Sequence, residues 1–518
     1  MRAYFGKCAA SARKQQDVSI VWDSSQLQNG HTLFIGRPGA GKTHQLRRFL
    51  SAFQEGNDPA RVHIFDVHDD LEVPGASEVI FSQSTPYGLN PLEVGPDPHF
   101  GGVNKCINAF LRTLNKVTGN LGPRQQPLLR NLLLDVYRSR GFDPDNARTW
   151  HVDPEQAHYL SDGSDGRIYL HIPFDEKDEA KSVGNVVWDR NMRAPGYETG
   201  CWWIAAKEYA GAITRWLPAT TGRMHPTLDD VIAYAKRQMM IAFMGSDQGA
   251  ITALEAFIKA SRAHYKQELA LLKSGGVNRP DSLEESSSAK ERAGGKALEA
   301  YGRYLDAVRT GDEVENILKY DKADFKSVID RLESLKASGI FKSEPPPFDP
   351  SARVWRYRIR ALEREEKRLF VLFRLRELYN AAVERGEVKG LRDIIVVDEA
   401  HLYADEDGED MLSVLAREAR KFGVAVIAAN QTPELPKDFI ASLATKVVLG
   451  IASEFNPQAI SRMGMTAEML KWIQPKSTMA IQMQDSSPTS GEWRGVLLRR
   501  PTAPSQPGNQ GAAAAVAR

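Results

Sequence analysis

The sequence predicts an α/β protein whose core is a mainly parallel sheet, and three observations support this fold class. Residues 33–50, LFIGRPGAGKTHQLRRFL, run from an apolar strand through a glycine-rich turn into an amphipathic helix. Residues 61–72, RVHIFDVHDDLE, form a second apolar strand that ends in acidic residues. In the stretch 391–403, LRDIIVVDEAHLY, an apolar run again ends in acidic residues. Such continuous apolar runs are typical of parallel strands that are buried on both faces.

Composition and charge exclude several classes of protein. Hydrophobic residues make up 42% and charged residues 26% of the 518 residues, which describes a folded globular chain. The net charge of +1 gives no chain-wide attraction to polyanions, so any nucleic-acid surface must be local. The cysteines, Cys8, Cys106 and Cys201, form neither a disulfide framework nor a zinc motif. Without a secretory signal or a long apolar span, we expect a cytoplasmic protein with no direct membrane insertion.

The stretch GRPGAGKT, residues 36–43, has the GxxxxGK[ST] spacing of a phosphate-binding loop in the strand, loop and helix context that this motif requires. Its glycines let backbone N–H groups close around phosphate oxygens, and the following helix directs its positive end at the same charge. Lys42 would reach the β- and γ-phosphates, and Thr43 would ligate Mg²⁺. The predicted cofactors are therefore ATP, or GTP, and Mg²⁺. The loop residues predicted to bind the nucleotide are Gly36, Pro38, Gly39, Ala40, Gly41, Lys42, Thr43 and His44.

A nucleotide site of this kind needs an acidic residue from another core strand to position Mg²⁺ and water. Asp398 would hold the Mg²⁺ shell, and Glu399 would polarise the attacking water. The alternative is a buried strand that merely ends in an acidic turn. Because Lys42 and Asp398 are separated by most of the polypeptide, large insertions must lie between their strands.

Further candidate catalytic residues follow the acidic pair. The strand at 424–432 ends in Asn430 and Gln431, and an amide at this position can contact the γ-phosphate or the attacking water. The alternative is an amide that only satisfies the turn. The amphipathic helix before this strand leaves Arg417 and Arg420 outside its buried face. Either arginine would stabilise γ-phosphate charge in an adjacent subunit, or would be an ordinary solvated charge.

Several phrases together resemble the HerA/FtsK superfamily of ring-forming ATPases, especially the HerA-like branch that includes type IV secretion ATPases. These phrases are GRPGAGKT, HIFDVHDD, YGLNPLE, VVDEAHLY, LAREARKFGVAVIAANQTPELP and SLATKVVLG. The resemblance covers residues 30–140 and about 330–495. It implies a RecA-like P-loop NTPase core that assembles as a homo-oligomer, usually a hexamer, with ATP at subunit boundaries. DNA or protein would move through the central pore.

The resemblance also implies a role for each matching residue. The catalytic residues that it implies are Lys42, Glu399, Gln431, Arg417 and Arg420. It adds Asp66, which ends the second strand, to the residues that bind the nucleotide, and it gives Thr43 and Asp398 as the Mg²⁺ ligands. The N-terminal β-barrel, membrane helices or winged helix that accompany this motor in its relatives are not expected here.

Changes in composition and hydrophobic pattern along the chain predict its domain organisation. The polar stretch 274–295, SGGVNRPDSLEESSSAKERAGG, is too hydrophilic to bury a core and predicts a flexible loop. The predicted segments are an N-terminal half of the ATPase core with a helical segment (1–149), a small aromatic α+β insert (150–225), a helical insertion (226–338), a C-terminal half of the core (339–500) and a disordered tail (501–518).

The aromatic insert resembles a small domain of unknown function found in primase-like proteins of conjugative plasmids. The resemblance rests on residues 168–209, IYLHIPFDEKDEAKSVGNVVWDRNMRAPGYETGCWWIAAKEY. Trp188, Trp202 and Trp203, with nearby lysine and arginine, would make a stacking surface for single-stranded nucleic acid. A small core built on these tryptophans is the alternative.

Three functions are compatible with these features. The first is a ring-forming ATPase that translocates DNA for a conjugative or mobile element, or for a defence system. The second is a type IV secretion-like ATPase that energises protein transport or assembly at a membrane complex. The third is a non-motor ATP-dependent switch or scaffold. The expected partners are further copies of the chain, DNA and, for the second function, an effector or a protein of a membrane complex.

Overall fold

The computed structural model shows two compact units. The first unit combines Met1–Ser82 with Pro346–Arg518, and the second is the intervening Gln83–Pro345. The predicted tail, 501–518, lies outside the described residues. The structure describes residues 1–54, 59–153, 159–161, 165–172, 177–194, 197, 199–209, 213, 216–244, 248–274, 281–307, 322–406, 408–486 and 490–498.

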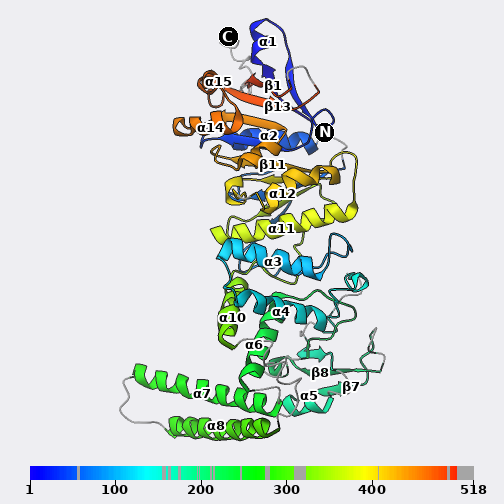
Figure 1. Ribbon diagram of the computed structural model, residues 1–518, viewed down its shortest axis with the longest axis vertical. Helices are drawn as coiled ribbons and strands as arrows, with labels where there is room; N and C mark the ends of the chain where they lie inside the picture. Colours follow the sequence, from blue (N-terminus) through cyan, green and yellow to red (C-terminus); the bar gives the residue numbers. More distant parts are fainter. Residues whose placement is uncertain are drawn as a thin grey trace, which may run out of the picture. The chain divides into compact units, whose positions relative to one another are not determined.

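The first unit is built on one 11-stranded sheet with the order β2-β1-β14-β13-β12-β3-β11-β10-β4-β9-β5 (Figure 1). Its parallel strands are β3 (Thr32–Gly36), β4 (Arg61–Asp66), β5 (Ser77–Ile80), β9 (Val354–Arg358), β10 (Asp393–Val397), β11 (Val424–Asn430) and β12 (Thr445–Gly450). Its antiparallel strands are β1 (Arg2–Cys8), β2 (Ser19–Asp23), β13 (Thr478–Met483) and β14 (Trp493–Leu497). The predicted α/β core with a mainly parallel sheet is confirmed.

Strand order brings distant parts of the sequence to one edge of this sheet. β11 lies between β3 and β10, with Asn430 opposite Ile35 and Ala428 opposite Val397. On its other side β3 pairs with β12. Because parallel strands end at a common edge, the residues that follow β3, β10 and β11 meet there, where α/β sheets usually bind ligands.

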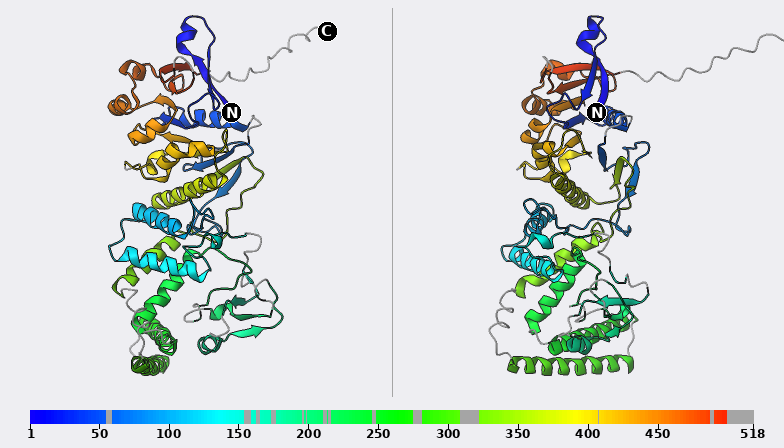
Figure 2. Two further views of the ribbon diagram at one scale, coloured as in Figure 1. Left: turned by 45° about the vertical axis from the view of Figure 1, so that its right-hand side comes forward. Right: turned by 90° about the vertical axis from the view of Figure 1, so that its right-hand side faces the viewer.

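Helices cover both faces of the sheet. On one face α2 (Lys42–Gln54) packs Phe49 and Phe53 against Phe5, Trp22 and Phe34, and the Phe49 and Phe53 rings lie 4.7 Å apart. On the other face lie α11 (Arg364–Arg385) and α12 (Met411–Glu418) (Figure 2). The shorter helices of this unit are α1 (Ala9–Arg13), α13 (Lys437–Ser442), α14 (Asn456–Met463) and α15 (Ala467–Trp472).

The second unit combines helices with a small sheet. Four of its helices are α3 (Val103–Thr118), α4 (Gln125–Ser139), α6 (Leu228–Met244) and α10 (Lys322–Ala337). The long helices α7 (Gln248–Ser274) and α8 (Asp281–Ala307) lie side by side (Figure 1). The small sheet has the order β6-β8-β7, with α5 (Lys177–Val183) beside β6 (Arg167–Leu170), β7 (Val187–Asp189) and β8 (Cys201–Ala205). The predicted helical insertion and α+β insert are thus present.

The structure differs from the predicted flexible loop at 274–295. Residues from Asp281 onward are helical and begin α8, while 275–280 lie outside the described residues. A few widely spaced apolar side chains, among them Leu283 and Tyr304, are buried and anchor the helix. The polar composition of the stretch obscures this apolar pattern in the sequence. The helices α3 and α4 also belong to the second unit, although the predicted boundaries join them to the core.

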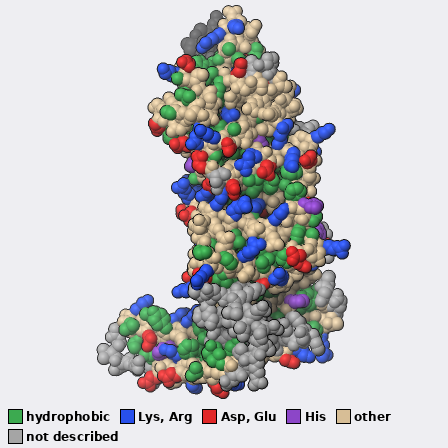
Figure 3. Space-filling model, in the orientation of Figure 1, with side chains coloured by type: hydrophobic (Ala, Val, Ile, Leu, Met, Phe, Trp, Pro, Cys, Tyr) green, Lys and Arg blue, Asp and Glu red, His purple; other side chains and the backbone are tan. Residues whose placement is uncertain are grey.

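Two properties of the chain, its helix composition and its surface charge, bear on the expected partners. None of the helices in the described part of the chain is long and apolar enough to cross a bilayer. On the face shown in Figure 3, basic and acidic side chains are interspersed, in keeping with the net charge of +1. A surface for a polyanion on this face would therefore be local.

Protonation of His31 is expected to destabilise the first unit in mild acid. His31 is buried, its Nδ1 accepts the Val426 N–H at 2.9 Å, and burial together with the charge of Arg420 lowers its pKa to about 4. In the unfolded chain the pKa is about 6.5, so below that pH the unfolded state takes up the proton first. About 2 kcal/mol of unfolding free energy should be lost between about pH 7 and 5.

The control is His31→Asn, which keeps an acceptor for the Val426 N–H but cannot titrate. Urea unfolding at a series of pH values should show a smaller loss for this variant. An identical pH dependence in the two proteins would show that folding does not lower the pKa of His31.

Candidate active site

The loop between β3 and α2 has the form of a phosphate cradle. Arg37 N–H donates to the Gly450 carbonyl at 2.9 Å, and Ala40 N–H donates to the Arg37 carbonyl at 3.0 Å. Gly39 (φ +78°) and Gly41 (φ +94°) occupy the left-handed region, which a side chain would disfavour. The loop therefore presents its backbone at the N-terminus of α2, where N–H groups and the helix dipole favour an anion.

Lys42, at the start of α2, is joined to both acidic residues that follow β10. Its Nζ lies 2.8 Å from Asp398 Oδ1 and 3.3 Å from Glu399 Oε1. These side chains are 11%, 4% and 6% exposed, so the ion pairs are largely shielded from water. The structure thus brings together three predicted site residues from opposite ends of the chain.

The three groups perturb one another. Burial disfavours the charged form of Lys42, but the two carboxylates outweigh it and raise the pKa of the ammonium. Burial raises the pKa of Asp398, and the attraction of Lys42 only partly offsets this. Burial acts on Glu399 in the same direction, yet the hydrogen bond from Gln431 and the charge of Lys42 lower its pKa overall. Glu399 is therefore an ionised carboxylate at neutral pH.

Several polar groups converge on Glu399. Gln431 Nε2 donates to Glu399 Oε1 at 2.8 Å, His68 Nε2 lies 3.5 Å from Oε1, and His401 Nδ1 lies 3.4 Å from Oε2. His401 Nδ1 is also 2.8 Å from Asn430 Oδ1. The Glu399 backbone is left-handed (φ 52°), which is uncommon for a residue with a side chain. This strained residue is thus held in place from three neighbouring segments.

Thr43 has a partner that the sequence did not suggest. Its Oγ1 donates to Asp70 Oδ2 at 3.2 Å, and Asp70 Oδ1 is buried without a hydrogen-bond partner among the described residues. Arg47, one turn further along α2, donates Nε to the Asp70 carbonyl at 2.7 Å. The only local signal for Asp70 is the acidic pair in VHDD after β4, which does not specify a contact with the loop.

Asp66, a predicted nucleotide-binding residue, lies beneath the site. It is 0% exposed and accepts the N–H groups of Asp69, Asp70 and Leu71 at 2.8, 3.2 and 2.8 Å. Its Oδ2 also accepts two hydrogen bonds from the buried Arg356, at 2.9 and 2.7 Å. With its oxygens committed to these donors, Asp66 shapes the loop that carries Asp70.

Most of the other predicted site residues are exposed. Pro38 and His44 are exposed, and Gly36 is buried at the end of β3. Arg417 and Arg420 project into solvent from α12 and the following turn. Neither guanidinium makes a hydrogen bond or ion pair with a residue that the structure describes. The structure therefore does not join either arginine to Lys42 and the acidic pair of the same chain.

The donor set fits a magnesium ion. Ligand atoms of His68, Asp398 and Glu399 all lie within 4.8 Å of one another. Mg²⁺ prefers oxygen ligands, which favours the carboxylates of Asp398 and Glu399 over the imidazole, while Thr43 stays a predicted ligand.

Of the three predicted tryptophans of the aromatic insert, Trp202 and Trp203 pack against its small core, whereas Trp188 is 36% exposed. Trp202 packs on the buried cluster around Leu170 and Ile204, with Lys181 Nζ 5.2 Å from its ring centre. Trp203 carries Arg167 over its ring at 4.6 Å. The ring faces that a base would need are thus partly occupied, which favours the structural alternative.

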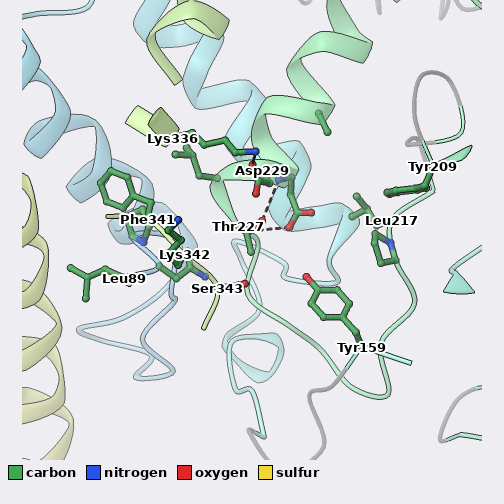
Figure 4. A pocket seen from close by; sticks show the side chains of 16 residues that line it. Leu89, Tyr159, Tyr209, Leu217, Thr227, Asp229, Lys336, Phe341, Lys342 and Ser343 are labelled. Atoms are coloured by element: carbon green, nitrogen blue, oxygen red, sulfur yellow. Dashed lines mark hydrogen bonds and ion pairs between the residues drawn. The ribbon is translucent and has the colours of Figure 1, made fainter. Parts of the chain in front are cut away.

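A separate cavity of about 270 Å³ lies within the second unit (Figure 4). Tyr159 and Leu217 line one side, and Leu89 and Phe341 line the other. Three of its charged lining residues are paired, because Asp229 is bonded to Lys336 and Asp230 is bonded to Arg140. The cavity has no glycine-rich loop and is distinct from the Lys42 site.

The chain resembles known proteins in two respects: a family model matches the aromatic insert, and solved structures match the whole fold. A family model described as a domain of unknown function (DUF5710) matches residues 167–218, the region of the aromatic insert. No curated protein matches the chain. The structure of VirB4 of Thermoanaerobacter pseudethanolicus is 14% identical, covers 97% of both chains and has a TM-score of 0.53. The plasmid coupling protein TrwB in complex with a non-hydrolysable ATP analogue is 12% identical, with 98% and 96% covered and a TM-score of 0.42.

The likeness to VirB4 establishes the fold over almost the whole length of both chains. Together with the strand order, it confirms the predicted RecA-like P-loop core. Because the identity is only 14%, this likeness shows the fold and nothing about activity.

Removal of the Arg356 charge is expected to destabilise the first unit. Arg356→Met would leave Asp66 buried without its cation, and removal of one partner from a buried ion pair costs about 3–5 kcal/mol. Arg358→Met is the matched control, because Arg358 is 30% exposed and pairs with Asp69 at the surface. Urea unfolding should show a loss of at most about 1 kcal/mol for the control. Equal losses would contradict the buried role of Arg356.

Proposed function

We propose that this chain is a Mg²⁺-dependent ATPase motor that couples hydrolysis to the movement of DNA, for a conjugative or other mobile element or for a defence system. The observation that carries the proposal is the contact of Lys42 with Asp398 and Glu399 beside a glycine-rich loop. The RecA-like core and the resemblance of its motifs to the HerA/FtsK superfamily support the choice of a motor.

Nucleotide binding would begin with an exchange of partners by Lys42. The ammonium is protonated at neutral pH, because the carboxylates raise its pKa. Triphosphate oxygens in the loop would draw it away from Asp398, which frees that carboxylate. Asp398 and Thr43 would then hold Mg²⁺, which supplies charge neutralisation at the phosphates when bound.

Glu399 would act on the attacking water. Its lowered pKa leaves it ionised and able to accept a hydrogen bond from water. Gln431 immediately follows β11, donates to the carboxylate at 2.8 Å, and precedes α13 in the chain. Loss of the γ-phosphate would change these contacts, so Gln431 is placed to report the state of the nucleotide.

The proposed active form is a homo-oligomer, a hexamer by resemblance. Arg417 and Arg420 are exposed, and neither pairs with any residue described in its own chain. A neighbouring subunit would give them a use, because an arginine inserted in trans stabilises phosphoryl-transfer charge.

A type IV secretion-like ATPase is the second candidate. The likeness to VirB4 over 97% of both chains favours it, since the likeness includes the second unit as well as the core. Such a motor would act on protein and would not need to respond to DNA.

ATP turnover with and without DNA is the test that separates the two candidates. A DNA motor should hydrolyse ATP several-fold faster with DNA, and the gain should fall with salt because phosphate contacts are screened. Lys42→Ala should lower turnover by about 100-fold or more, as loss of one charge-stabilising donor does in other enzymes. Turnover that is indifferent to DNA favours the secretion-type function, and full activity in Lys42→Ala would overturn both.

The trans role of arginine has its own test. Arg417→Ala or Arg420→Ala should lower turnover by about 10³-fold or more if that residue stabilises the transferring phosphoryl group. Glu399→Gln should bind ATP without hydrolysing it. Mixing the two inactive variants should partly restore activity, because some boundaries then combine an intact Glu399 with an intact arginine. Arg364→Ala, an exposed arginine on α11, is the control; a mixture that stays inactive would argue against the trans role.

A further inference from the structure

The segment between α15 and β13 lies against the phosphate-binding loop. A β carbon on Gly450 would lie 3.5 Å from both Pro475 Cγ and Ala40 Cβ. A β carbon on Gly41 would lie 3.9 Å from Lys476 Cγ. The stem of the Lys476 side chain therefore runs beside the loop residue that immediately precedes Lys42.

Lys476 has an unfavourable backbone conformation. Its φ of +64° is left-handed, and in the described chain only Gln15, Asp69 and Glu399 share this feature among non-glycine residues. A lysine gains nothing from this conformation, whereas a glycine would adopt it freely. The surrounding turn enforces it, because Ser477 and Thr478 N–H groups both donate to the Gln474 carbonyl, at 3.1 and 2.9 Å.

The Lys476 ammonium has no structural use that the described residues reveal. The side chain is exposed, and it makes no hydrogen bond or ion pair with any residue in the described part of the chain. Lys42, by contrast, is neutralised by two carboxylates. Lys42 is thus already paired, whereas Lys476, beside Gly41, has no partner among the described residues.

We propose that Lys476 is a second cation of the nucleotide site and binds the phosphate chain; the inference rests on the proposed function. In loops of this type the backbone beside Gly41 faces the α- and β-phosphates, whereas the lysine that follows it reaches the β- and γ-phosphates. Lys476 would therefore contact phosphates that ATP and ADP share. A contact made equally before and during hydrolysis strengthens binding without changing the rate of the chemical step.

Binding of fluorescent ATP and ADP with Mg²⁺ tests the inference. Lys476→Ala should weaken both nucleotides about tenfold, as expected for one lost charge-assisted hydrogen bond, and should raise KM without lowering kcat. Lys476→Arg should restore most of the affinity. Lys471→Ala removes an equally exposed lysine from α15 and should leave binding unchanged.

Lys476→Gly separates ligand binding from folding. It relieves the left-handed backbone, so its thermal unfolding midpoint should not fall, while its nucleotide affinity should fall as in Lys476→Ala. Affinities within twofold of the wild type in the Ala and Gly variants, or an equal loss in Lys471→Ala, would overturn the inference alone. Absence of nucleotide binding by the wild-type protein would overturn the proposed function and the inference with it.

Discussion

One ammonium shared by two shielded carboxylates sets the geometry of the first unit. Lys42 belongs to the helix after β3, while Asp398 and Glu399 follow β10, two positions away in the sheet. Their separation of 356 residues along the chain is closed by the intervening β11, whose register with both strands aligns the ends. Unpaired charges in such a setting would be strongly disfavoured, so the loop, the acidic strand and the sheet order support one another.

Around these three residues lies a layer of residues that support the site. Arg356 neutralises Asp66, Asp66 holds three successive backbone N–H groups, and the loop so formed presents Asp70 to Thr43. Gln431 similarly fixes a carboxylate whose backbone is in an unfavourable conformation. Rigid support of this kind keeps charged groups in place while a ligand replaces their partners.

The parts of the site that could be predicted are those with a local sequence signature. The glycine spacing of the loop and the apolar run before Asp398 each require particular residue types at fixed positions, and the sheet then brings them together. Asp70 and Lys476 lack such a signature, because their significance comes from packing against the loop by segments distant in sequence. Asp66 was predicted as a site residue, but its burial could not be predicted, because it depends on the ion pair with the distant Arg356.

The prediction was wrong about the helical insertion for a different reason. The serine- and glutamate-rich start of α8 resembles a solvated loop in composition, yet α7 provides a surface on which a few apolar residues suffice for helix formation. In the aromatic insert, tryptophan and basic residues have the composition of a stacking surface, whereas their cation–π pairing with one another is a property of the folded domain.

The connection between β5 and β9 has an evolutionary consequence. These two strands are parallel neighbours, with Ile80 opposite Arg358, so the whole second unit is topologically one crossover between adjacent strands at the margin of the sheet (Figure 2). Substitution of that crossover by another of different size would leave β3, β10 and β11 in their places. A lineage can thus exchange the whole second unit while the strands that carry Lys42, Asp398 and Gln431 are inherited intact.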